Sequence, residues 1–222
     1  MEMAEARVIS AEILAPWAEV VPDAGPLTVA DLLALPDDGW RYEVVEGVLV
    51  RVAGSGAKAT TVGRRLAARL GDYVDERDLG LVTGADGVFK FLGAETGLLP
   101  DAGYLASEHA DLIAIADLSK PISFPPDLAA EVASPSQGSD AMAAKARQYL
   151  HGGTALVWVL WPERGEVDVW RPDDLRPRYQ DMRPSVTLRA DAGDVLDGED
   201  VVPGFLYSVA PLFVIRRGHP AR

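Results

Sequence analysis

The segment PPDLAAEVASPS, from Pro125 to Ser136, restricts the fold more than any other part of the chain. Residues 128–133 within it are apolar except for Glu131, a pattern that is typical of a strand in the protein interior. A lone carboxylate on a buried strand costs several kcal/mol unless another group compensates its charge. The fold must therefore supply a partner for Glu131, and that partner is either structural or chemical.

Helix-like and strand-like segments alternate along the chain. Amphipathic spacing predicts a helix that contains Val62 and ends near Gly80, and a second helix in SDAMAAKARQYL with Ser139 or Asp140 as its N-cap. Thr28 is the expected N-cap of a shorter helix. The strand-like segments are RYEVV and VLVRV, which form a hairpin at Glu46-Gly47, and then LVTGADGVFKFL, TGLLPDAGYLA, DLAAEVAS, ALVWVLW and EVDVW. Because helices lie between strands, we predict the α/β class with a mixed sheet.

The composition is ordinary for a soluble globular protein: 222 residues, 48% of them hydrophobic and 25% charged. We divide the chain into a lead-in (1–25), a single domain (26–214) and a tail (215–222). The absence of cysteine excludes disulfides and thiolate metal sites and favours a reducing cytoplasm. The N-terminal residues lack a signal-peptide pattern and no apolar stretch is long enough to span a bilayer, so we expect no membrane partner.

The net charge of −13 disfavours broad nonspecific attraction to nucleic acid, which depends on neutralising phosphates. One segment departs from this acidity, because residues 51–69 hold five basic side chains and no acidic one. A locally basic surface can exist on an acidic protein. We therefore expect this segment to be the nucleic-acid-binding face, or else an ordinary solvated helix surface, and its candidate residues are Lys58, Arg64, Arg65 and Arg69.

Asp101 and Glu131 are the first candidates for chemistry, since both lie on strand-like segments that are mostly apolar. Two carboxylates brought together at one edge of a sheet repel each other, and a Mg²⁺ ion relieves that repulsion because it prefers oxygen ligands. Alternatively, each residue is a turn or cap residue that reaches solvent or a nearby arginine. Lys145 lies at the border of the apolar face of the second helix, where its ammonium can reach inward towards Glu131.

This combination of an Asp, a Glu on an apolar strand and a nearby Lys resembles the active site of the PD-(D/E)XK nuclease superfamily. The segments RYEVVEGVLV, LLPDAGYL, PPDLAAEVASPS, KARQYL, ALVWVLWPERGEVDVW and GEDVVPGFLYSVAPLF occur in the order found in the Uma-two family of restriction endonucleases. The resemblance extends from about Thr28 to Phe213, nearly the whole chain.

The resemblance implies a restriction-endonuclease-like core, with a mixed β-sheet flanked by α-helices on both faces. It implies a Mg²⁺-dependent (or Mn²⁺-dependent) endonuclease that hydrolyses phosphodiester bonds in DNA. Asp101 and Glu131 would be the metal ligands and Lys145 a transition-state or water-orienting cation. Glu43 matches the early acidic position of the family and would supply a further carboxylate.

Three positions depart from these patterns. Ala133 occupies the place of the usual superfamily lysine, Ala59 that of a histidine common in the family, and Val48 that of a second acidic residue in the hairpin turn. The resemblance implies that the family lysine stands on the following helix instead, where Lys145 matches it. The losses at Ala59 and Val48 support an alternative in which the chain is a weakened or inactive member that serves as a binding or assembly module. The sequence leaves open whether DNA or RNA is cut and with what sequence preference.

Other interpretations have weaker support. The glycines of VAGSGAKATT precede a helix but do not have the spacing of a phosphate-binding loop. His109, His151 and His219 are scattered and predict no catalytic triad. A homodimer is considered because many enzymes that cut both strands are dimers, with the VWVLW region or the C-terminal segment as its interface.

Overall fold

The computed structural model describes residues 15–22, 24–91, 95–113 and 120–215. Most of the expected lead-in, nearly all of the expected tail, and His219 lie outside these ranges. Within the described part, no helix is long and apolar enough to cross a membrane.

A six-stranded mixed sheet forms the centre of the molecule, in the order β11-β10-β9-β8-β7-β4. Its strands are β4 (Gly80–Thr83), β7 (Ala102–Ala106), β8 (Leu128–Val132), β9 (Leu156–Trp161), β10 (Glu166–Trp170) and β11 (Val186–Arg189). Strands β8 and β9 are parallel and the other neighbours are antiparallel. The α/β class with a mixed sheet, predicted from the sequence, is confirmed.

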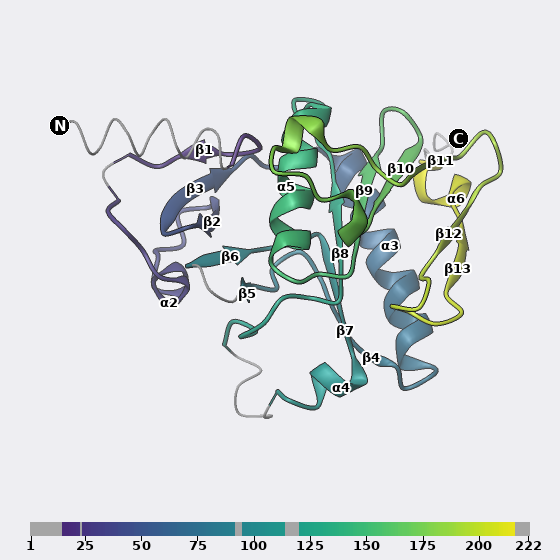
Figure 1. The fold of residues 1–222 in the computed structure, drawn as a ribbon, viewed down its shortest axis with the longest axis horizontal. Helices are drawn as coiled ribbons and strands as arrows, with labels where there is room; N and C mark the ends of the chain where they lie inside the picture. Colours follow the sequence, from purple (N-terminus) through teal and green to yellow (C-terminus); the bar gives the residue numbers. More distant parts are fainter. Residues whose placement is uncertain (1–14, 23, 92–94, 114–119, 216–222) are drawn as a thin grey trace, which may run out of the picture.

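Two helices cover the opposite faces of this sheet, α3 (Ala57–Asp75) and α5 (Ser139–His151). Figure 1 shows β8 between them. Alternate residues of β8 point to opposite faces, so that Ala129 packs in the cluster that contains α5 and Ala130 in the cluster that contains α3. Glu131 follows the same alternation and points towards α5, which places its carboxylate in the interior rather than in solvent.

A second sheet, β1-β3-β2-β6-β5, lies on the α5 side of the molecule (Figure 1). Its strands are β1 (Glu19–Val20), β2 (Arg41–Val45), β3 (Val48–Val52), β5 (Phe89–Phe91) and β6 (Thr96–Leu98). Glu46 and Gly47 join β2 to β3, both with positive φ, as a tight hairpin turn requires. Helix α2 (Val29–Leu33) precedes it and is capped by Thr28 as predicted, through a capping box with Asp31.

The remaining elements are short helices and a small two-stranded sheet. Helix α4 (Ser107–Ala110) follows β7, and the 3₁₀ helices η2 (Pro172–Asp174) and η3 (Tyr179–Asp181) follow β10. A small sheet of β12 (Val195–Asp197) and β13 (Leu206–Ser208), with α6 (Ala210–Phe213), covers the α3 side. Phe205 anchors this segment, because its ring lies 5.4 Å from that of Tyr73 and 5.9 Å from that of Trp158.

Three local expectations are wrong. The N-cap of α5 is Gly138, not Ser139 or Asp140, because both residues already belong to the helix and its first turn has no side-chain cap. Helix α3 ends at Asp75 rather than near Gly80, since Asp78 adopts a left-handed conformation that turns the chain into β4. The VWVLW segment is β9, a fully buried strand between β8 and β10, so it offers no surface to a second copy.

Candidate active site

Lys145 forms the centre of a buried ionic cluster. It lies in the middle of α5, and its Nζ atom is 3.0 Å from Glu131 Oε1 and 3.1 Å from Glu43 Oε1. Glu131 comes from β8 of the central sheet and Glu43 from β2 of the second sheet. The side chains of all three are at least nine-tenths buried. Lys145 therefore joins the two sheets through one ammonium group, and the partner that Glu131 requires is a cation.

Two further side chains complete the cluster, and sequence reasoning missed both. Trp17 donates a 2.9 Å hydrogen bond to Glu43 Oε2, and its ring centroid lies 5.9 Å from Lys145 Nζ. Tyr149 donates a 2.6 Å hydrogen bond from its hydroxyl to Glu131 Oε1. Trp17 falls within the segment expected to be a lead-in, and Tyr149 is one of the buried residues of α5. The sequence indicates Tyr149 more readily than Trp17, because a position four residues after Lys145 lies on the same helix face.

Burial controls the charges in this cluster. It raises the pKa of Glu131 to about 7, an effect that the charges of Asp101 and Glu43 reinforce and that Lys145 and the Tyr149 hydroxyl oppose. Burial alone would lower the pKa of Lys145, but Glu131 and Glu43 outweigh it and raise that pKa above its ordinary value. Burial also raises the pKa of Tyr149 well above its ordinary value. Both shifts favour a charged Lys145 ammonium and a neutral Tyr149 hydroxyl that donates to Glu131.

Asp101 lies at the edge of the cluster, directly before β7. The register pairs Ala102 with Ala130, so Asp101 stands one position beyond this pair, and its side chain lies beside Gly63 of α3. Asp101 Oδ2 accepts a 2.8 Å hydrogen bond from the backbone N–H of Val132, and its side chain is 19% exposed. This exposure, against 7% for the side chain of Glu131, makes Asp101 the more accessible of the two carboxylates.

Arg41 lies beside Asp101 and is a further site residue that the sequence did not indicate. Its Nη1 atom is 3.8 Å from Asp101 Oδ1, while Nη2 donates to the backbone carbonyls of Ala85 and Leu99 at 2.6 and 3.2 Å. The two carbonyl contacts fix the guanidinium, and its side chain remains 35% exposed. A fixed and accessible guanidinium next to a carboxylate is suited to contact a phosphate.

The carboxylates of this site are of the donor type that a magnesium ion prefers. Among the described residues there is no group of three or more His, Cys, Asp or Glu side chains that could form a complete protein cage for a metal. Mg²⁺ does not need one, because it commonly keeps several waters and uses one or two carboxylates together with substrate phosphates. Asp101, directly before β7, and Glu131, on β8, carry the hard oxygen donors that Mg²⁺ or Mn²⁺ prefers, and they are the two residues that would hold such an ion.

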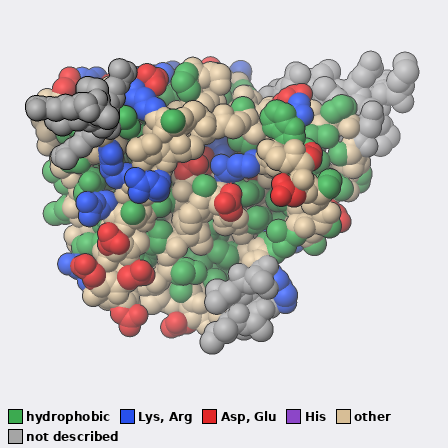
Figure 2. Space-filling model, turned by 180° about the vertical axis from the view of Figure 1, so that it is seen from behind, with side chains coloured by type: hydrophobic (Ala, Val, Ile, Leu, Met, Phe, Trp, Pro, Cys, Tyr) green, Lys and Arg blue, Asp and Glu red, His purple; other side chains and the backbone are tan. Residues whose placement is uncertain are grey.

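The predicted nucleic-acid-binding residues all lie on α3, with different surroundings. Lys58 Nζ is 3.1 Å from Glu163 Oε2, and Arg65 donates to the carbonyls of Pro211 and Leu212, which ties α6 to α3. Arg64 is exposed, and the guanidinium of Arg69 is 3.9 Å from Asp72 in a surface pair. Figure 2 shows basic side chains gathered beside a hollow on one face of the molecule, with acidic side chains nearby.

The alanines and the described histidines singled out from the sequence lie in helices or at the end of a strand. Ala133 and Ala59 are buried, on the α5 and α3 sides of the sheet respectively. His109 lies in α4 with Nδ1 2.8 Å from Asp127, and His151 is the last residue of α5. The ionic cluster therefore uses Lys145 from the helix, without a lysine at position 133.

The mixed sheet between α3 and α5, with Asp101 directly before β7, Glu131 on β8 and Lys145 reaching Glu131 from α5, defines a restriction-endonuclease-like α/β protein. The family described as "Putative restriction endonuclease", Uma2, matches residues 29–210, and the chain belongs to this family. A similar solved structure is that of "a putative nuclease belonging to DUF820" from Anabaena variabilis, with a TM-score of 0.66 and 17% sequence identity. The similarity covers 85% of this chain and 98% of that chain. The search of curated proteins finds no match.

Proposed function

We propose that the protein is a metal-dependent endonuclease that hydrolyses phosphodiester bonds in DNA, with Mg²⁺ or Mn²⁺ as its cofactor. The observation that carries this proposal is the Lys145 ammonium, buried between Glu131 and Glu43, with the more accessible Asp101 directly before the adjacent strand. A buried cation between carboxylates is an expensive arrangement if its purpose is stability alone. Such arrangements occur where ionisable groups have a function.

Each residue has a role that follows from its position. Asp101 and Glu131 would hold the metal ion, which supplies a more acidic bound water and charge stabilisation for the phosphate. Lys145 opposes the rise in the pKa of Glu131 and orients its carboxylate, because its ammonium lies 3.0 Å away. Arg41, fixed by two carbonyls, faces the phosphate beside Asp101 and offsets negative charge that grows during hydrolysis. Glu43 orients Lys145 from the second sheet.

The second candidate is a member of the family that binds a partner without catalysing a reaction. The observations that favour it are the alanine at position 59 and the number of protein partners already bound to Glu43, which are Trp17, Leu99 and Lys145. Calorimetric titration with Mn²⁺ separates the two candidates. Binding in the wild type that is lost in Asp101→Ala counts against the non-catalytic candidate.

Nicking of a supercoiled plasmid tests the proposed function directly. We expect the wild-type protein to convert supercoiled DNA to the open circle with Mg²⁺ or Mn²⁺ and not with EDTA. Glu131→Gln and Glu131→Ala should abolish nicking, and Glu108→Ala, which removes an exposed carboxylate of α4, should leave it unchanged. Circular dichroism must show that the variants are folded. Absence of nicking in the wild type, or equal nicking in folded Glu131 variants, would reject the proposal.

A further inference from the structure

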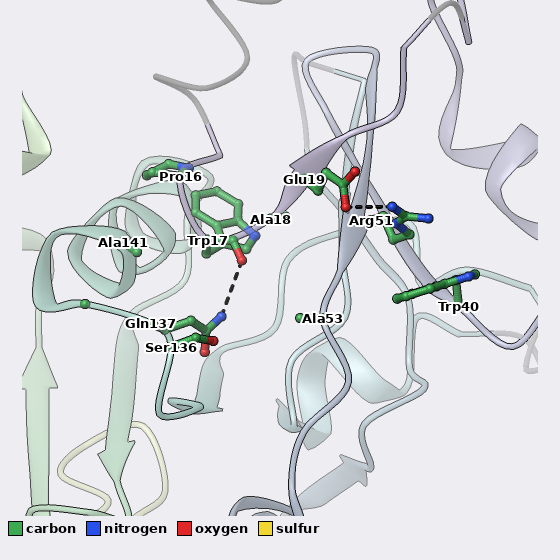
Figure 3. A pocket seen from close by; sticks show the side chains of 11 residues that line it. Pro16, Trp17, Ala18, Glu19, Trp40, Arg51, Ala53, Ser136, Gln137 and Ala141 are labelled. Atoms are coloured by element: carbon green, nitrogen blue, oxygen red, sulfur yellow. Dashed lines mark hydrogen bonds and ion pairs between the residues drawn. The ribbon is translucent and has the colours of Figure 1, made fainter.

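A pocket of about 450 Å³ opens between the N-terminal end of α5 and the second sheet. Figure 3 shows its two sides: Trp17 and Gln137 on one, and Glu19, Arg51 and Trp40 on the other. Its volume is within the range of pockets that hold small organic ligands, about 300–1,000 Å³. It is therefore large enough for one nucleotide.

Trp40 gives this pocket an aromatic wall. Its side chain is 50% exposed, which is unusual for so large an apolar group, and it lies directly before β2. The guanidinium of Arg51 lies 4.3 Å from the centroid of the ring. A cation packed over an indole is attracted to the ring and helps to hold it in place. The exposed part of the indole is thus a fixed surface on which a planar ring can stack.

Trp17 connects the pocket to the ionic cluster. It lines the pocket and is 4% exposed, its carbonyl accepts a 3.4 Å hydrogen bond from Gln137 Nε2, and its indole N–H donates to Glu43. Its ring centroid is 5.9 Å from Lys145 Nζ. A ligand in the pocket is therefore separated from the cluster by a single side chain. Gln137 and Ser136 are polar groups at the rim. The Gln137 amide also accepts from the Ser134 N–H, and the Ser136 hydroxyl lies 3.1 Å from that of Ser134, so the second N–H of the Gln137 amide is the donor that the edge of a base would meet.

The charges of the pocket select which part of a nucleotide it can hold. Arg51 is paired with Glu19 at 2.6 Å, so the two side chains bring almost no net charge to the pocket. Glu19 is 68% exposed and would repel a phosphate placed next to it. A neutral base stacked on Trp40 meets no such repulsion. The chemistry of the pocket therefore suits a nucleobase, with its phosphates pointing away from Glu19.

We propose that this pocket is a subsite for one unstacked base of a nucleic-acid strand, with Trp40 as the stacking surface and Gln137 and Ser136 at the edge of the base. The inference rests on the proposed nuclease function, because it assigns the base to the strand that the ionic cluster acts on. It predicts that single-stranded or locally opened DNA binds more tightly than a closed duplex of the same sequence, since only an unpaired base can stack on an indole.

Binding without cleavage tests this subsite. The probe is a 5′-fluorescein-labelled ten-nucleotide single-stranded DNA, titrated with the intact protein in EDTA at low salt and followed by fluorescence anisotropy. Stacking on an aromatic side chain contributes about 1–3 kcal/mol per base, so Trp40→Ala should weaken binding by roughly 5-fold to 150-fold. Trp40→Tyr keeps a ring and should bind nearly as the wild type does. Leu206→Ala, which removes a 64% exposed side chain on β13, is the matched surface control and should have no effect.

Two results would overturn the inference: Trp40→Ala binding within twofold of the wild type, or a wild type that binds the labelled strand no better than the duplex. A change in oligomeric state alone, seen for Trp40→Ala by size-exclusion chromatography, would assign the pocket to a protein interface instead. The nicking assay remains separate. A wild type that binds the strand through Trp40 but does not nick plasmid supports the subsite while rejecting the proposed function.

Discussion

Replacing Lys145 with methionine removes the cation of the cluster and keeps most of its volume. Glu131 and Glu43 then face each other in the interior without a positive charge between them. At the separations of 3.0 and 3.1 Å, each lost attraction amounts to about 5 kcal/mol at an effective dielectric constant of about 20. The desolvation of the ammonium, which the variant no longer requires, offsets part of this. Measured losses for breaking buried pairs suggest a net destabilisation of about 3–5 kcal/mol.

Urea denaturation followed by circular dichroism measures this loss. With a slope of about 2 kcal/mol per molar, a change of about 4 kcal/mol lowers the midpoint by about 2 M. The deficit should be larger at pH 8 than at pH 5. Without Lys145, the pKa of Glu131 rises further above its value of about 7, so the variant keeps losing stability at pH values where the wild-type carboxylate is already ionised.

Lys90→Met is the matched control. Lys90 is also paired with a glutamate, Glu95, at 3.5 Å, but its side chain is 39% exposed. A surface pair of this kind contributes at most about 1 kcal/mol. If Lys145→Met lowers the free energy of unfolding no more than Lys90→Met does at pH 8, the cluster does not hold the buried charges described above. Its geometry would then give no reason to assign it a function.

Three further predictions concern packing, hydrogen bonding and pH. Gly152→Ala should destabilise the protein by about 1–3 kcal/mol in thermal unfolding, because the new methyl group would overlap the ring of Phe91, whereas Gly71→Ala, in open space on α3, should be neutral or stabilising. Tyr149→Phe should cost about 1.5–3 kcal/mol in urea denaturation at pH 8, since it removes a hydrogen bond to a buried carboxylate; a loss below 0.5 kcal/mol would contradict the 2.6 Å contact. Hydrogen bonding to the neighbouring carboxylate raises the pKa of His109, so its contribution to stability is complete below its unfolded pKa and is lost as the pH rises through the folded one. His109→Ala should therefore lose more stability at pH 5 than at pH 8. Equal losses at both pH values would show that the ion pair between His109 and Asp127 does not stabilise the fold.

The parts of the fold set by local periodicity could be predicted from the sequence. Three such elements depend only on residues that are close together in the sequence. They are the hairpin at Glu46-Gly47, the apolar strand around Glu131 and the helix that presents Lys145 inward. The partners of these residues could not be predicted, since they depend on how the two sheets dock. No periodicity relates Trp17 to Glu43, or Glu43 to Lys145, and the pattern gave no sign of a second sheet.

The residues of the candidate site also divide into those that the local sequence indicates and those that it does not. Glu43 entered the prediction only through a family resemblance, because a glutamate in a strand of the hairpin carries no local sign of burial. Arg41 gave no signal at all, because its role follows from two backbone carbonyls more than forty residues away in sequence. The roles of the basic residues of α3 in nucleic-acid binding stay predictions, and Arg65 has a structural task in holding α6.

The position of Lys145 between the two sheets also bears on how the protein unfolds. The second sheet cannot leave α5 without taking Glu43 away from the ammonium, which strands charge in a partly apolar setting at the moment of separation. A partly opened state of this kind is penalised more heavily than either the native or the fully unfolded chain. Both sheets should therefore melt in one cooperative transition, and hydrogen exchange of β2 and β8 should report the same opening free energy.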